Sequence, residues 1–190
     1  MAADATRSPT LFDPTAFERF RFVGRELDRD GHVRLQYALD HEISFVEEFD
    51  LPIDGVLSDE QIAAVEGLLS LLHWVAGVSY FKTAAPPLVA CETGAPPPAT
   101  AALLEALYSE GLGEFAYTNG LAGLPRPVFA PGPAVAGGVP VAEEDPRRVL
   151  VPAGGGKDSA VAVEIVRRSG CELSLFSIGD APPILSLIHI

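Results

Sequence analysis

Residues 149–159 read Val-Leu-Val-Pro-Ala-Gly-Gly-Gly-Lys-Asp-Ser, and this stretch decides the fold of the last part of the chain. The apolar run that stops at Pro152 predicts a strand, and Lys157 opens a helical pattern that continues to Arg168. Glycines between a strand and a helix let peptide N–H groups approach an anion without a Cβ in the way. The helix N-terminus adds unpaired donors and a partial positive charge. The predicted phosphate-binding loop consists of Gly154, Gly155, Gly156, Lys157, Asp158 and Ser159.

Each polar residue of this loop has an expected role. We expect Lys157 to meet the phosphate charge as a point cation and Ser159 to donate its hydroxyl. We expect Asp158 either to help place Mg²⁺ or to cap the start of the helix. The alternative for the whole stretch is a glycine-rich turn in an unrelated fold.

The spacing excludes two common phosphate loops. A Walker A loop needs Ser or Thr directly after Gly-Lys, and here Asp158 stands in that place. The dinucleotide-binding pattern G-x-G-x-x-G needs a third glycine, and here Ser159 stands in that place.

The segment 153–159 instead resembles the Ser-Gly-Gly-x-Asp-Ser loop of the PP-loop ATP pyrophosphatases. That resemblance implies ATP as the ligand, cleaved between the α and β phosphates, with Mg²⁺ as its metal. Either Gly154-Gly155 or Gly155-Gly156 aligns with the glycine pair of that loop. In the second alignment the leading Ser falls on Gly154, so one hydroxyl ligand is absent.

The residues around the loop predict a parallel strand–helix–strand unit. We expect a strand at 148–152, a helix at 157–169 closed by Gly170, and a strand at 172–178. With the PP-loop resemblance, we expect this to be the first βαβ unit of a doubly wound α/β domain, in which ligands lie beyond the carboxyl ends of the strands. Two strands and one helix cannot enclose ATP, so we expect 147–190 to be only the start of that domain.

The last residues have two interpretations. Residues 185–190, Leu-Ser-Leu-Ile-His-Ile, resemble translated sequencing-adapter read-through, and the alternative is a genuine apolar strand. We expect 183–190 to be a non-native tail and the chain to be the N-terminal piece of a longer enzyme.

Upstream, the pattern predicts an α+β domain over residues 1–122, followed by a Pro/Gly-rich linker or long loop over 123–146. Alternating apolar residues predict an antiparallel β meander, in which Phe20, Phe22 and Gly24 share one face. The remaining expected elements are a hairpin turn at 28–31, a helix from a capping box at Ser58 to about Ala76, a Pro-rich loop at 85–99, a helix at 100–110 and a short helix at 114–117. The first helix should bury Ile62, Val65, Leu68, Leu69, Leu72 and Val75.

Composition restricts the partners and the location. A net charge of −13 without any Lys/Arg cluster argues against a nucleic-acid partner. Cys91 and Cys171 lie far apart without metal-ligand spacing, which is typical of reduced thiols in a cytoplasmic protein. The start shows no signal peptide, and no run of 18 apolar residues is present, so we expect no membrane-spanning helix.

Two further stretches carry a more specific resemblance. Residues 73–87 read His-Trp-Val-Ala-Gly-Val-Ser-Tyr-Phe-Lys-Thr-Ala-Ala-Pro-Pro, and residues 106–121 include Gly-Leu-Gly-Glu-Phe. Together with the glycine loop, they resemble the family of ATP-dependent epimerases of peptidoglycan precursor synthesis over roughly residues 20–180. The resemblance implies a nucleotide-sugar dipeptide substrate, UDP-N-acetylmuramoyl-L-alanyl-L-glutamate. It also implies inversion of the terminal glutamate after adenylation of a carboxylate, with release of AMP and pyrophosphate.

The two stretches contain the candidate substrate residues. Lys82 is expected to hold a carboxylate or phosphate, with a solvated lysine as the alternative. Tyr80 and Ser79 are candidate hydrogen-bond donors, although packing with a wet tip is the more usual role of a tyrosine. Glu114 is a candidate base or metal ligand, or else a surface residue at a helix start. A catalytic role for His73 or for the pair of cysteines is the weaker interpretation, and Trp74 is expected in the core.

Two other functions remain open at this point. One is a different PP-loop adenylating enzyme, such as an amide ligase or a tRNA-modifying enzyme, of which the acidic charge disfavours the second. The other is an inactive nucleotide-binding fragment, because the adenine pocket is not recognisable in these residues.

Overall fold

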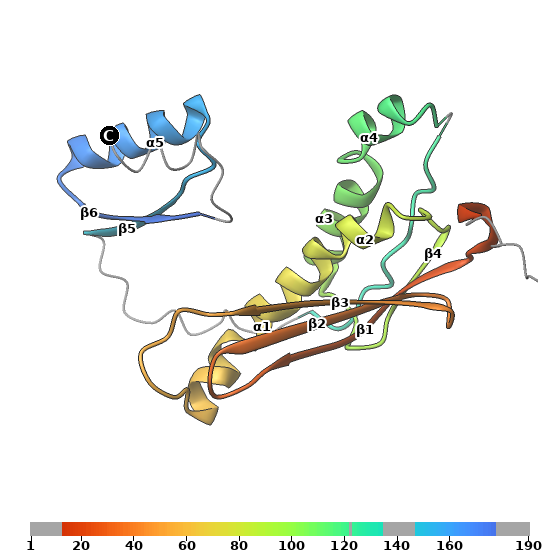
Figure 1. Cartoon of the computed structure of the whole chain (residues 1–190), viewed down its shortest axis with the longest axis horizontal. Helices are drawn as coiled ribbons and strands as arrows, with labels where there is room; N and C mark the ends of the chain where they lie inside the picture. Colours follow the sequence, from red (N-terminus) through yellow and green to blue (C-terminus); the bar gives the residue numbers. More distant parts are fainter. Residues whose placement is uncertain (1–12, 122, 135–146, 178–190) are drawn as a thin grey trace, which may run out of the picture. The chain divides into compact units, whose positions relative to one another are not determined.

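A computed structural model describes residues 13–121, 123–134 and 147–177, and the chain divides into two compact units, 1–139 and 140–190. The first unit is α+β, and the second holds a βαβ unit (Figure 1). The strands of the first unit are β1 (Arg19–Leu27), β2 (His32–Leu39), β3 (Ile43–Asp50) and β4 (Leu88–Cys91). Its helices are η1 (Pro14–Ala16), α1 (Asp59–Ala76), α2 (Val78–Phe81), α3 (Pro98–Ser109) and α4 (Gly113–Thr118).

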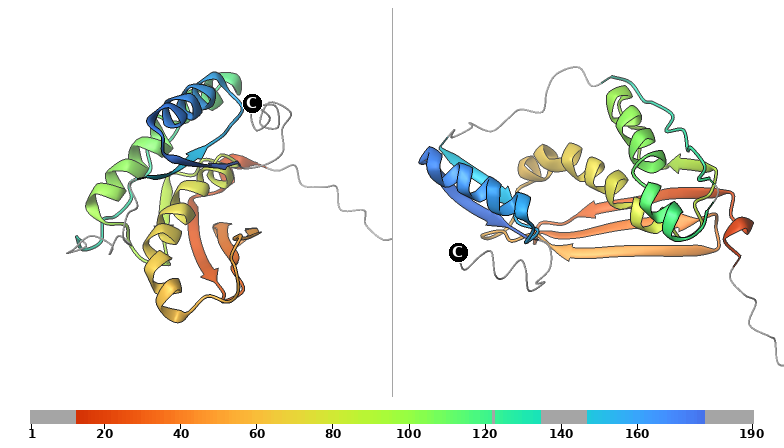
Figure 2. Two further views of the ribbon diagram at one scale, coloured as in Figure 1. Left: turned by 90° about the vertical axis from the view of Figure 1, so that its left-hand side faces the viewer. Right: turned by 90° about the horizontal axis from the view of Figure 1, so that it is seen from above.

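The first three strands form the predicted meander. The sheet order is β3-β2-β1-β4, with antiparallel pairing among β1, β2 and β3. The β1–β2 turn closes through hydrogen bonds between Asp28 and both Gly31 and His32. Gly31 has a φ of 84°, a conformation that glycine adopts without steric cost. The helices lie on one face of this sheet (Figure 1 and Figure 2).

The expectation of a plain loop over 85–99 is wrong, because Leu88–Cys91 form β4. This strand runs parallel to β1, with Arg19 opposite Leu88 and Phe22 opposite Cys91. Four residues are too few to show a strand period, and the pairing partner lies far away in sequence. Arg21 supports the pairing from β1, since its Nε lies 2.6 Å from the Glu92 carboxylate that follows β4.

The predicted alternation of β1 also fails after Phe22. The register with β2 shifts between Phe22 and Gly24, which marks a β-bulge. Phe22 pairs with Tyr37 and shares its buried face, but Gly24 pairs with Gln36 on the opposite face. The extra residue therefore reverses the facing of every later side chain in β1.

Helix α1 begins as the sequence predicts, and its burial agrees with the prediction only in part, since Leu69 is buried as expected. Ser58 Oγ accepts from the Gln61 N–H at 3.2 Å, and the Gln61 side chain accepts from the Ser58 N–H at 2.9 Å, completing the capping box. Leu68 and Leu72 were expected inside but are 62% and 42% exposed. The buried residues of α1 are Leu69, Ser70, His73 and Trp74.

Residues Asp59–Phe81 form a helical stretch long and apolar enough to cross a membrane by length and composition. The expectation that no such helix exists is therefore wrong on these criteria. Core helices of soluble proteins pass the same test, and α1 places Leu69 and Trp74 in the core of the first unit.

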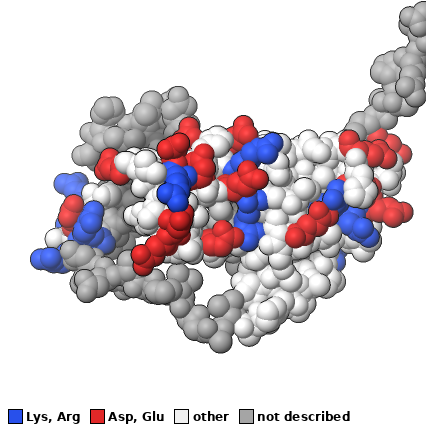
Figure 3. Space-filling view, turned by 90° about the horizontal axis from the view of Figure 1, so that it is seen from below, with Lys and Arg blue, Asp and Glu red and all other residues white. Residues whose placement is uncertain are grey.

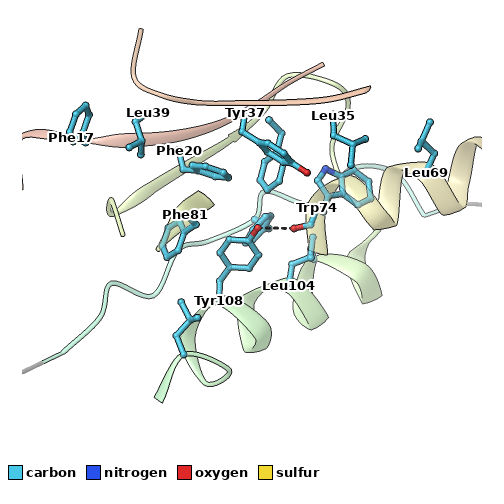
Figure 4. Packing of buried hydrophobic residues seen from close by; sticks show 14 of the residues in the cluster. Phe17, Phe20, Leu35, Tyr37, Leu39, Leu69, Trp74, Phe81, Leu104 and Tyr108 are labelled. Carbon is cyan, nitrogen blue, oxygen red and sulfur yellow. Dashed lines mark hydrogen bonds between the residues drawn. The ribbon is translucent and has the colours of Figure 1, made fainter. Parts of the chain in front are cut away.

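The core of the first unit is rich in aromatic rings. Phe20, Phe22 and Phe81 are fully buried, and Phe81 meets the Tyr108 ring edge-on at 5.0 Å. Figure 4 shows the Tyr108 hydroxyl directed at the Trp74 carbonyl, to which it donates a hydrogen bond of 2.7 Å. This bond ties α3 to the end of α1 and satisfies a buried hydroxyl.

The helices predicted at 100–110 and 114–117 are present as α3 and α4. Leu104 and Tyr108 of α3 are buried. Residues 123–134, the described part of the predicted linker, contain no helix or strand. Phe129 from this segment is nevertheless 1% exposed and packs against Tyr108 and Phe22. The segment is therefore an ordered loop that belongs to the core of the first unit.

The described part of the second unit matches its prediction. It consists of β5 (Arg148–Pro152), α5 (Lys157–Ser169) and β6 (Glu172–Phe176), with β5 and β6 parallel. Gly170 ends α5 in the left-handed conformation at φ 76°. Residues 178–190, including the suspected tail, lie outside the described residues.

Candidate phosphate loop and substrate residues

The glycine loop connects the carboxyl end of β5 to the first turn of α5. Gly155 has a φ of 78°, a left-handed conformation that strains any other residue. Gly156 is the N-cap of α5, and no side chain caps the N–H groups of the first helical turn. The backbone donors at this end of α5 are therefore available to an anion.

The hydroxyl of Ser159 holds the loop together from inside the helix. Its oxygen accepts a hydrogen bond from the Gly154 N–H at 3.0 Å. At the other end, the Ala153 N–H donates to the Phe176 carbonyl at 2.7 Å, which extends the β5–β6 pairing up to the loop. Because the oxygen is the acceptor, the Ser159 hydroxyl proton remains available for a ligand.

Lys157 and Asp158 both lie exposed in the first turn of α5. Asp158 is not the N-cap, since Gly156 has that place, so the capping alternative for Asp158 is wrong. Neither side chain has an ion pair within the described ranges. Both charged groups are thus open to a ligand at the helix N-terminus.

The loop supplies a single carboxylate, that of Asp158, toward a metal ion. Across the described residues, no group of three or more His, Cys, Asp and Glu side chains is placed to hold a metal. Mg²⁺ commonly takes one or two carboxylates and completes its shell with phosphate oxygens and water. Asp158 can supply one such carboxylate beside the loop.

Tyr80 lies against the sheet. Its ring stacks on Tyr37 at 4.8 Å and packs on Phe45 at 5.1 Å, and its hydroxyl donates a short hydrogen bond to the Glu47 carboxylate. Burial, followed by the hydrogen bond to Glu47, raises the pKa of Tyr80 to about 12. Tyr80 is therefore a neutral phenol with an engaged proton, which corresponds to the packing alternative. Sequence reasoning missed Glu47, whose only signal was its position in a strand facing solvent.

Lys82 points in another direction, toward α4. Its Nζ lies 5.9 Å from the centre of the Phe115 ring, a cation–π distance. Glu114 is the neighbour of Phe115 in sequence and is exposed in the first turn of α4. Lys82, at the end of α2, thus lies against α4; this region, together with the exposed Glu114, is named the α2–α4 surface, whereas Tyr80 faces β2 and β3. Asn119 ends α4, where its side chain donates to the Phe115 carbonyl at 2.8 Å.

The weaker candidates are buried. His73 is 0% exposed, its Nε2 lies 3.1 Å from the Gln36 carbonyl, and desolvation lowers its pKa to about 4. Burial raises the pKa of the Cys91 thiol to about 11, so this sulfur is protonated at neutral pH. Neither group has the protonation behaviour of an accessible base at neutral pH. Trp74 lies in the core, as predicted.

Comparison with known proteins identifies the family of this chain. The family model described as the MurL N-terminal domain matches residues 11–189. Three curated relatives carry the name UDP-N-acetyl-alpha-D-muramoyl-L-alanyl-L-glutamate epimerase. The relative from Xanthomonas oryzae pv. oryzae (strain MAFF 311018) is 39% identical over 177 residues, which is 90% of this chain and 38% of the relative.

The relative from Salinispora tropica is 41% identical over 169 residues, covering 85% of this chain and 36% of its own length. The relative from a Micromonospora species is 39% identical over 181 residues, which is 90% of this chain and 39% of the relative. The chain thus spans less than two fifths of the length of these curated relatives, and no solved structure matches it. Because the family model covers nearly the whole chain, this protein belongs to the family of the MurL N-terminal domain.

Proposed function

We propose that this chain is part of an ATP-dependent epimerase that inverts the terminal L-glutamate of UDP-N-acetylmuramoyl-L-alanyl-L-glutamate to the D form. The observation that carries the proposal is the family match over residues 11–189, together with relatives that are named for this reaction. We place the enzyme in the cytoplasm, where nucleotide-linked precursors and free cysteines such as Cys91 are both expected.

The chemistry needs the charge of a glutamate carboxylate to be removed. The Cα–H beside a carboxylate is very weakly acidic, because the carbanion would lie next to a negative charge. Attack of the carboxylate oxygen on the α-phosphorus of ATP forms an acyl–phosphate bond and releases pyrophosphate. A base can then remove the Cα proton, a proton returns on the opposite face, and water releases AMP and the free carboxylate.

In this proposal the glycine loop holds the phosphates. The N–H groups at the start of α5 and the hydroxyl of Ser159 donate to phosphate oxygens, and Lys157 neutralises charge on them. Asp158 is the residue that would hold Mg²⁺, which would screen the charge that resists carboxylate attack.

The α2–α4 surface of the first unit carries the candidate substrate residues. Lys82 has no ion pair among the described residues, so its charge is available to a substrate carboxylate or phosphate. Glu114 is the candidate base on the same surface. The role of Tyr80 is to position Glu47 and the strand edge, since its proton is already donated.

The surface charge of the chain helps to decide whether its substrate is a tRNA. Figure 3 shows acidic and basic side chains mixed on one face of the molecule, without a broad basic area. Such a surface disfavours a tRNA substrate, which needs a basic footprint. An amide ligase with the same loop remains the second enzymatic candidate, and an inactive nucleotide-binding chain is the third.

An assay with the full-length protein distinguishes these functions. UDP-N-acetylmuramoyl-L-alanyl-L-glutamate is incubated with ATP and Mg²⁺ in D₂O, and the glutamate is recovered for chiral analysis. The proposal expects D-glutamate carrying deuterium at Cα, and only when ATP is present. Formation of an amide, or L-glutamate without deuterium, would contradict it. Titration of the 190-residue chain with ATP tests the third candidate, for which binding without turnover is expected.

A further inference from the structure

A cavity of about 500 Å³ lies in the first unit, away from the α2–α4 surface. Its walls come from α1, the end of β1, the β4–α3 loop and the ordered loop near Pro133. The volume falls within the range of small-molecule sites, roughly 300–1,000 Å³. The residues that matter here are Arg25, Trp74, Thr93, Pro97, Thr100 and Pro133.

The β-bulge in β1 directs Arg25 to this cavity. Arg25 pairs with Leu35 of β2, which is fully buried on the helix side of the sheet. Without the extra residue between Phe22 and Gly24, strict alternation would turn Arg25 to the opposite face. Bulges often reorient a side chain beside a functional site. The fold thus places a guanidinium, 13% exposed, where an apolar residue would otherwise pack.

The charge of the Arg25 guanidinium is balanced by Glu66, but not all of its N–H donors are used. Its Nε and Nη2 donate to the Glu66 carboxylate at 3.0 and 2.5 Å, and its Nη1 donates to the Thr93 carbonyl at 2.9 Å. A guanidinium has five N–H groups, so two remain for a ligand. Because Glu66 cancels the charge, this wall favours a neutral acceptor over a phosphate.

The other walls select a flat apolar group. Leu68, Leu71 and the two prolines give mostly apolar surface, on which a sugar ring would leave hydroxyls unpaired. The Thr93 hydroxyl is covered and has no partner among the described residues, so a rotation of its side chain toward a ligand acceptor gains a hydrogen bond. A planar ring with carbonyl oxygens satisfies all of these features.

We propose that this cavity binds the uracil ring of the nucleotide-sugar substrate, with Arg25 donating to a ring carbonyl. This inference rests on the proposed function for the identity of the substrate. It adds a binding site that is separate from the glycine loop and from the α2–α4 surface. Uracil presents two carbonyl acceptors, whereas adenine has no carbonyl and accepts only through ring nitrogens in a larger bicyclic ring, so the two bases are distinguishable at this site.

The chain carries its own reporter, since Trp74 in the cavity wall is the one tryptophan of the sequence. The 190-residue chain is titrated with uridine, UDP, adenosine and N-acetylmuramoyl-L-alanyl-L-glutamate while the fluorescence of Trp74 is followed. We expect saturable changes with uridine and UDP at similar dissociation constants, and none with the other two probes. Binding of UDP without uridine would identify the phosphates as the ligand and overturn the proposal, as would equal binding of adenosine or of the sugar dipeptide.

Matched variants test the residues. Arg25→Lys keeps the positive charge but loses the forked donors, so it should weaken uridine binding roughly tenfold or more. Arg34→Lys is the control, because Arg34 on β2 forms an ion pair with Glu48 on β3 outside the cavity. Thr93→Val removes one hydroxyl at constant shape, should weaken binding severalfold, and serves if Arg25→Lys does not fold. Unchanged uridine binding in both folded variants would overturn the assignment.

The test of the uracil site and the test of epimerisation can fail independently. If the protein epimerises its substrate but uridine and UDP leave Trp74 unchanged, only the uracil site is wrong. If uridine binds but no epimerisation occurs, the site stands and the reaction must be reassigned.

Discussion

In the four-stranded unit Phe20, Phe22 and Phe81 are 0% exposed, whereas in the β5–α5–β6 unit Leu150 and Ile165 are 65% and 64% exposed. The first unit closes an aromatic core between its sheet and its helices. In the described part of the second, α5 contains no buried residue, and the buried apolar residues are Val151 and Ala153 beside the glycine loop. The difference shows that the loop geometry is set locally, by β5 and the start of α5, without a core around it.

This contrast concerns the packed core of the first unit and the glycine loop of the second. The first unit has the packing that holds a domain together, and the second has the loop that the proposed ATP chemistry needs. Substitutions of the buried aromatic residues should therefore change the free energy of unfolding, whereas substitutions in the loop should change ligand binding.

The largest expected effect comes from Phe81→Ala. Removal of this fully buried ring leaves a cavity under Phe20 and Tyr108 and should lower the free energy of unfolding by about 3–5 kcal/mol. Ile165→Ala on the exposed face of α5 should change it by less than about 0.5 kcal/mol. Urea unfolding followed by Trp74 fluorescence and by circular dichroism measures both. Equal effects would contradict the contrast between the units.

Acid should destabilise the first unit through His73. Burial lowers its pKa from 6.5 to about 4, so between these pH values the unfolded chain binds a proton that the folded chain does not. The contribution of His73 to the free energy of unfolding should be complete above pH 6.5 and should fall by about 3 kcal/mol as the pH drops to 4. The exposed His32 beside Asp50 has a raised pKa and acts in the opposite direction.

Urea unfolding at several pH values checks this expectation. In His73→Gln the fall between pH 6.5 and 4 should shrink, even if the variant is less stable at neutral pH. An unchanged pH profile in this variant would show that other groups cause the loss.

Gly77→Ala tests the close approach between α1 and the sheet. A Cβ at Gly77 would lie 2.5 Å from the Phe22 ring and 2.8 Å from the Tyr108 hydroxyl, so both must move. The cost should be about 1–3 kcal/mol. Gly113→Ala at the start of α4 is the matched control, since its Cβ meets nothing within 4 Å. Thermal unfolding should show a lower Tm for Gly77→Ala and an equal or higher one for Gly113→Ala.

The smallest expected effect concerns how the two long helices start. Ser58→Ala removes the side-chain cap of α1 and should cost about 1 kcal/mol of unfolding free energy. Helix α5 has no such cap, so Gly156→Ser should cost little stability but should weaken ATP binding by supplying a competing acceptor. Stronger ATP binding by Gly156→Ser would show that the free N–H groups of α5 do not hold phosphate.

Local signals in the sequence predicted much of this fold. The meander, the capping box at Ser58, the βαβ unit and the left-handed Gly170 follow from alternation, caps and glycines. The strand β4 and the bulge before Gly24 did not, because both depend on pairing with β1 rather than on a local period. Burial on α1 was predicted only in part, because Leu69 is buried but Leu68 and Leu72 line an open apolar cavity beside the strands, and apolar spacing does not show how closely two elements pack.

In the candidate sites, too, local features were predicted and long-range contacts were not. The glycine loop is one continuous segment, so its pattern alone predicted the turn and the helix start. The contact of Tyr80 with Glu47 and the placement of Arg25 beside Glu66 join residues more than 30 positions apart. Such pairs leave no spacing signal in a single sequence.

In the proposed function, the loop from Gly154 to Ser159 serves carboxylate adenylation by ATP. Phosphorus NMR of the full-length protein with ATP and UDP-N-acetylmuramoyl-L-alanyl-L-glutamate follows this step. We expect AMP and pyrophosphate in the wild-type reaction, and a fall of about 10²–10³-fold in their rate of formation in Lys157→Ala. Formation of ADP and phosphate, or epimerisation that proceeds without ATP, would contradict it.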